Sequence, residues 1–138
     1  MLPRLCERVV LPSVVRAELG AADAPVRVQS WIANPPTWLD IVLGPMVVNP
    51  AGIHKGEAAA IALAGSMGAD LLLIDDRRGV RAAKQQGLRV TGTLGILDLA
   101  AERGLLDFRS ALEKLKRTTF RRPEAVMNVL LSKHRERE

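Results

Sequence analysis

Short apolar runs alternate with amphipathic stretches along most of this chain of 138 residues. Four apolar runs predict β-strands, at residues 8–11, 38–43, 71–74 and 88–91. Helical spacing and glycine stops predict helices over residues 12–19, 54–67, 78–86, 93–103 and 107–116, the last two capped by Thr93 and Asp107. The pattern over residues 26–32 is ambiguous. Because strands and helices alternate, the chain is expected to be an α/β domain with a parallel sheet.

The run at residues 71–74 is the most informative, because four apolar residues end directly in Asp75 and Asp76. A continuous run of this kind is typical of a strand buried on both faces, as in a parallel sheet. Acids at the carboxyl end of such a strand lie where open α/β sheets bind ligands. Two adjacent acids repel each other, so a divalent cation or the following Arg77 and Arg78 must compensate them.

Two further acids stand near helix ends. Glu18 lies near the end of the first predicted helix, and Glu57 lies in the first turn of the alanine-rich helix, whose start Gly56 is expected to loosen. Carboxylates from separate elements can converge on Mg²⁺, which typically uses one or two protein carboxylates and a substrate phosphate. Each also has an ordinary explanation: a solvated helix charge for Glu18, and a favourable interaction with the helix dipole for Glu57.

For the pair at residues 75 and 76, a helix cap explains one acid well and the second less well. A basic face begins beside these acids, because Arg77, Arg81 and Lys84 recur at helical spacing. A phosphate backbone could lie along that face, although a solvated helix surface explains it equally well. The net charge of +5 and the pI of about 10.1 favour an anionic partner, whereas 3% aromatic residues argue against base-stacking surfaces.

Other residues narrow the class of protein. Cys6 is the only cysteine, so no intrachain disulfide is expected, which fits a reducing cytoplasm. The apolar runs are far shorter than the roughly 20 residues of a membrane span, and the start of the chain does not resemble a signal peptide. His54 and His134 lack metal-ligand spacing and are expected at the surface.

The chain changes character at residue 117, where a basic segment precedes a last helix that Pro123 can start. Val126, Val129 and Leu130 are expected to form its apolar face, and residues 133–138 are expected to fray. We therefore expect one domain over residues 1–116 and a C-terminal helical extension over residues 117–138.

Three segments in order, VVLPSVVRAEL, KGEAAAIALA and ADLLLIDDRRGVRAAKQQGLRVTGTLGILDLAAERGLL, resemble the PIN-domain family. The resemblance covers roughly residues 8–106. It implies a three-layer α/β/α fold around a parallel sheet. It also implies an Mg²⁺- or Mn²⁺-dependent ribonuclease, often the toxin of a toxin–antitoxin pair.

Matched to the family's motifs, Glu18, Glu57 and Asp76 stand at the positions of catalytic acids, with Asp75 as neighbour or substitute of Asp76. The resemblance assigns the metal to Glu57, Asp75 and Asp76. Family members also open with a strand that carries an Asp, and this chain has no Asp before Asp23. We therefore expect a PIN-like fold that is truncated at its N-terminus.

Two functions remain open at this point. One is a metal-dependent nuclease that cleaves RNA, in which Arg77, Arg81 and Lys84 contact phosphates. The other is a non-catalytic module that binds RNA or a partner protein, which the missing Asp favours. In either case the uncovered strand at residues 71–74 is expected to drive self-association, by strand donation or with the last helix packed over the gap.

Overall fold

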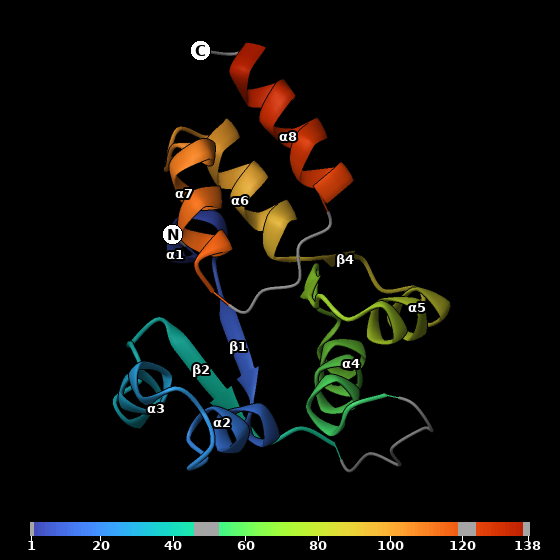
Figure 1. Cartoon of the computed structure of the whole chain (residues 1–138). Helices are drawn as coiled ribbons and strands as arrows, with labels where there is room; N and C mark the ends of the chain where they lie inside the picture. The colour runs from blue at the N-terminus through green and yellow to red at the C-terminus, as the bar shows by residue number, and fades with distance from the viewer. Residues whose placement is uncertain (1, 46–52, 119–123, 137–138) are drawn as a thin grey trace. The chain divides into compact units, whose positions relative to one another are not determined.

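The computed structural model describes residues 2–45, 53–118 and 124–136 of the chain. Its packing divides into an N-terminal unit, Leu2–Thr91, and a C-terminal unit, Gly92–Glu138. The N-terminal unit holds α1 (Leu2–Leu5), β1 (Val9–Pro12), α2 (Ser13–Leu19), α3 (Val26–Ala33), β2 (Leu39–Val42), α4 (Lys55–Met67), β3 (Leu72–Leu73), α5 (Arg77–Gln85) and β4 (Val90–Thr91). The C-terminal unit holds α6 (Thr93–Glu102), α7 (Phe108–Lys116) and α8 (Glu124–Glu136) (Figure 1).

The predicted α/β class is confirmed, and the strands of the described residues pair in parallel. They form two separate two-stranded sheets, β1 with β2 and β3 with β4. The ambiguous residues 26–32 are helical and form most of α3. The domain boundary expected at residue 116 stays a prediction, since the packing divides the chain between Thr91 and Gly92. No helix in the described parts of the chain is both long enough and apolar enough to cross a membrane.

Helix α4 is the central element of the N-terminal unit, because it contacts α2, β1, β3 and α5. Half of its buried residues are alanine, and small side chains let neighbouring backbones approach closely. The helix ends at Gly68, whose φ of 62° lies in the left-handed region that favours glycine. Ile61 and Ala64 of α4 pack with Leu72, Ile74 and Ala83 in one core cluster. This cluster fixes the ends of α4, β3 and α5 against one another.

The expectation that residues 71–74 are buried on both faces is wrong. Leu72 and Ile74 are 8% and 7% exposed, whereas Leu71 and Leu73 are 40% and 47% exposed. The segment therefore alternates as a half-buried strand does. Its inward face meets α4 and α5, and no strand of the described residues pairs with β3 except β4.

The C-terminal unit is a helical layer with its own core. Phe108, Leu112 and Met127 are almost fully buried, together with Leu94. The predicted cap of α7 is confirmed, because Asp107 Oδ2 accepts from the backbone N–H of Ser110 at 3.0 Å. The predicted cap of α6 is wrong: Gly92 occupies the N-cap, and Thr93 is the first helical residue.

The expected apolar face of α8 is wrong at Val126 and Val129, which are 48% and 68% exposed, whereas Leu130 packs against the core as predicted. The predicted surface position of His134 is also wrong. The packed side of α8 consists of buried Met127 and His134 with partly buried Leu130 and Leu131, and it lies within the C-terminal unit, where α8 contacts α6 and α7. Both sets of residues have helical spacing, so the hydrophobic pattern alone did not separate them. The proposed start at Pro123 lies outside the described residues.

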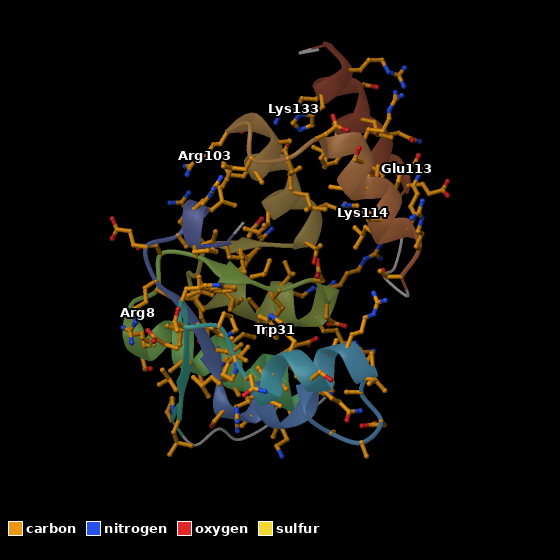
Figure 2. The ribbon with its side chains drawn as sticks, turned by 90° about the vertical axis from the view of Figure 1, so that its left-hand side faces the viewer. Arg8, Trp31, Arg103, Glu113, Lys114 and Lys133 are labelled. Carbon is orange, nitrogen blue, oxygen red and sulfur yellow. The ribbon has the colours of Figure 1, made fainter. Side chains whose placement is uncertain are left out.

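Polar contacts hold the side of α8 that contains His134 against α6. Asp98 Oδ1 of α6 lies 2.7 Å from His134 Nε2 and accepts a hydrogen bond from Lys133 Nζ at 3.0 Å. Lys133 also pairs with Glu102, and the His134 ring stacks on Phe108 with ring centroids 4.7 Å apart. Figure 2 shows Lys133 on α8. These contacts hold residues 133 and 134 in α8, where the sequence predicted fraying.

Burial raises the pKa of the Asp98 carboxyl, but hydrogen bonds from Lys133 and His134 outweigh it and hold the pKa below its ordinary value of 3.8. The ionised carboxylate therefore stabilises the fold above pH 3.8, and this contribution is lost as the pH falls through the folded-state pKa. Asp98 is thus one of two acids of α6, with Glu102, that form ion pairs with Lys133 of α8.

We expect Asp98→Asn to lower the free energy of unfolding of the C-terminal unit by about 2 kcal/mol at pH 7. The difference in stability from wild type should shrink below pH 3.8, because protonation of Asp98 there removes the charge from the wild type too. Urea unfolding followed by circular dichroism measures both. Glu113→Gln, on the exposed surface of α7 (Figure 2), is the control and should change stability by less than about 0.5 kcal/mol. A difference that grows on acidification would contradict this account.

Candidate active site

The first turn of α4 fixes Glu57. His54 is the N-cap: its Nδ1 accepts a hydrogen bond from the backbone N–H of Gly56 at 3.2 Å. The backbone N–H of His54 in turn donates to the Glu57 carboxylate. This reciprocal pair is a capping box, with histidine in the place that serine or threonine usually takes. The position of Glu57 is therefore set by the helix start.

The capping contact leaves Oε2 of Glu57 buried and without a hydrogen-bond partner. Burial, together with the negative charges of Asp76 and Glu18, raises the pKa of Glu57, although His54 acts in the opposite direction. Gly79 lies beside this oxygen: an ideal Cβ there would lie 2.5 Å from Ile74 Cδ1 and 3.2 Å from Oε2 of Glu57. The arrangement leaves a desolvated carboxylate among other acids.

Glu18 reaches the same helix start from α2. Its Oε1 lies 3.6 Å from His54 Nδ1, and its carboxylate lies against Gly56. Helices α2 and α4 are in contact, which explains how Glu18 meets residues 36 and 38 positions later in the sequence. The expectation of a purely solvated helix charge does not describe this position.

Asp76 is the N-cap of α5, which confirms the prediction that a helix cap explains one acid of the Asp pair. Its Oδ1 accepts from the backbone N–H groups of Arg78 and Gly79, at 2.9 and 3.2 Å. Asp76 is also close enough to Glu57 for its negative charge to raise the pKa of Glu57. Asp75 is exposed one residue earlier, and it has an interaction partner of its own. Of the pair, Asp76 is the acid that joins Glu57.

The donor set fits a hard divalent cation. Carboxylate oxygens are the ligands that Mg²⁺ prefers, and a buried carboxylate oxygen among like charges is stabilised by a cation. Within residues 2–45, 53–118 and 124–136, no group of three or more His, Cys, Asp or Glu side chains is close enough to hold a metal ion. The protein would therefore supply one or two carboxylates, as is usual for Mg²⁺.

The predicted basic residues lie on the outer side of α5. Arg77, Arg81 and Lys84 are exposed, while Gly79 and Ala83 are buried on the opposite side of the same helix. Because Asp76 caps this helix, the basic side begins one residue after the acids. A phosphate that lay along α5 would reach the acid site at the start of the helix.

Comparison with models of protein families shows which family the chain belongs to. The family model described as PIN domain matches residues 1–136, nearly the whole chain. The chain belongs to the PIN-domain family. PIN domains are generally nucleases that use divalent metal ions, and the parallel strand pairs agree with a PIN-like α/β fold. Comparisons with curated proteins and with solved structures found no match.

Three residues of this PIN domain were not expected at the site. His54 is an exposed residue, as predicted, with 63% of its side chain accessible, but it also caps α4 beside two acids. Gly56 and Gly79 make room for the carboxylates of Glu18 and Glu57. The spacing His-x-x-Glu at a helix start is the only sequence signal for any of these roles.

In this PIN domain without added metal, Glu57→Gln is expected to raise the free energy of unfolding at pH 7 by about 1 kcal/mol. The amide removes a desolvated charge among like charges and keeps an oxygen that accepts from the His54 backbone N–H. Thermal unfolding in the presence of a chelator measures the change. Glu113→Gln should have no effect, and a Glu57→Gln protein less stable than wild type would contradict the geometry.

Proposed function

We propose that this PIN domain is an Mg²⁺- or Mn²⁺-dependent nuclease that cleaves RNA. The observation that carries the proposal is the buried Oε2 of Glu57, which has no hydrogen-bond partner and faces the charges of Asp76 and Glu18. A structural carboxylate would be expected to find a donor or a counter-charge in such a place. An oxygen kept without one is suited to a cation.

Glu57 and Asp76 would hold the metal ion, with Asp75 beside them on the exposed side. Glu18 would add negative charge from α2. When bound, a divalent ion of this kind activates water and stabilises the leaving oxygen in phosphodiester hydrolysis. The α5 cap keeps Asp76 in one orientation through its two backbone hydrogen bonds.

Arg77, Arg81 and Lys84 support a nucleic-acid substrate. They are exposed on the helix that starts at the acid site, and the whole chain carries a net charge of +5. Cations at this spacing neutralise successive phosphates of a backbone. The proposal of RNA rather than DNA rests on the family resemblance.

A non-catalytic binding module is the second candidate. It is favoured by the absence, within the described residues, of a cluster of three metal-binding side chains. The same basic side of α5 would then bind RNA without cleaving it. Binding of RNA without cleavage in the presence of either metal ion would select this candidate.

Partner proteins and location are also proposals. Leu73 of β3 and Leu71 just before it expose apolar surface, which supports self-association through this strand. An antitoxin protein would be the partner if the domain is the toxin of a pair. The single free cysteine, Cys6, fits a cytoplasmic protein.

The nuclease proposal predicts cleavage of single-stranded RNA with Mn²⁺ or Mg²⁺ and none with a chelator. Glu57→Gln should lower the rate by at least about a hundredfold, because the acid that holds the cation is removed. Glu113→Gln of α7 is the matched control and should cleave as wild type does (Figure 2). Equal rates for wild type and Glu57→Gln would reject Glu57 as part of the active site.

Binding of single-stranded RNA is expected to weaken with salt, and each lost phosphate contact should reduce the slope of log K against log salt by about 0.7. We expect that reduction for Arg81→Ala and for Lys84→Ala, measured by fluorescence anisotropy with a chelator. Lys114→Ala removes an exposed charge of α7 and serves as control (Figure 2). A slope unchanged in Arg81→Ala and Lys84→Ala would show that α5 is a solvated surface.

A further inference from the structure

Gly56 stands where a side chain would meet the carboxylate of Glu18. An ideal Cβ built on this residue would lie 2.7 Å from Oε2, 2.9 Å from Oε1 and 3.1 Å from Cδ of Glu18. Real Cβ atoms essentially never come within 3.0 Å of such neighbours. The whole carboxylate of Glu18 therefore occupies the space that a methyl group at residue 56 would fill.

Apart from this contact, nothing at residue 56 favours glycine over alanine. Gly56 is buried in the first turn of α4, and its backbone N–H donates to His54 Nδ1 at 3.2 Å. Alanine would make the same hydrogen bond and would favour the helix. Gly65, in the same helix, offers the comparison, because a Cβ there would meet nothing within 4 Å.

We propose that Gly56 is a positioning residue of the acid site, which admits the Glu18 carboxylate beside His54 and Glu57 and so adds its negative charge to the cation site. Glu18 is one of the charges that raise the pKa of Glu57, and its Oε1 lies 3.6 Å from His54 Nδ1. A methyl group at residue 56 displaces the flexible end of Glu18 and leaves the α4 backbone in place. The inference rests on the proposed function.

The first test is Mn²⁺ binding by the full chain, measured by isothermal titration calorimetry. Gly56→Ala should weaken binding by about tenfold to hundredfold, as the loss of a supporting group around a metal typically does. Glu18→Ala should weaken it to a similar extent, and the double variant no further, since both act through the same carboxylate. Gly65→Ala is the matched control and should bind as wild type does.

The second test needs no metal. In the wild-type background Gly56→Ala should raise the thermal unfolding midpoint less than it does in the Glu18→Ala background, where no carboxylate opposes the methyl group. Gly65→Ala should raise the midpoint equally in both backgrounds. The difference between the two effects of Gly56→Ala measures the contact between residues 18 and 56. A cooperative unfolding transition in each variant shows that the variant is folded.

The outcomes are distinguishable. Mn²⁺ binding by wild type with unchanged affinity in Gly56→Ala overturns this inference and leaves the proposed function standing. A wild type that binds no Mn²⁺ overturns the proposed function, and the positioning role with it. Equal effects of Gly56→Ala in the two backgrounds overturn the steric contact itself.

Discussion

The N-terminal unit is organised around a carboxylate oxygen that the protein itself does not neutralise. The capping contact with His54 uses one side of the Glu57 carboxylate, and the packing of α5 over α4 removes the other oxygen from water. Two acids approach it from α2 and from the start of α5. Such an arrangement opposes folding by desolvation and by repulsion of like charges. A cation bound at the Glu57 oxygen would offset both of these costs.

The surrounding elements are shaped to keep that carboxylate in place. The alanines of α4 let α2, β1, β3 and α5 approach the same helix. Glycines stand at the two points where side chains would enter the site, Gly56 beside Glu18 and Gly79 beside Glu57. Asp76 is held by the two backbone N–H groups of the α5 cap. The site is thus built on helix starts, whose geometry is fixed by backbone hydrogen bonds.

Local rules were enough to predict much of this from sequence. Proline, glycine and capping residues placed most helix ends within one or two residues, including the caps at Asp107 and Gly68. The same rules identified a cap in the Asp pair, and Asp76 is that cap. The family resemblance singled out Glu18, Glu57 and Asp76, and in the structure Glu18 and Asp76 each lie within electrostatic range of Glu57.

Features that depend on distant partners were not predictable. Residues 71–74 look uniformly apolar, but only their neighbours decide that Leu71 and Leu73 stay exposed. His134 is buried because it meets Asp98, which is 36 residues away in sequence. Gly56 was interpreted as a weak helix start, since its contact with Glu18 exists only after α2 packs on α4.

The central claim is that the cation belongs at Glu57. Addition of Mn²⁺ to ¹⁵N-labelled protein, followed by amide relaxation in nuclear magnetic resonance spectra, tests it most directly. Broadening should be strongest at the amides of His54 and Gly79, because the His54 N–H donates to the Glu57 carboxylate and Gly79 lies beside its Oε2. The chain carries its own comparison in Asp98 and Glu102, a second pair of acids that Lys133 already neutralises. Broadening centred on Asp98 and Glu102, or none at any amide, would contradict the account.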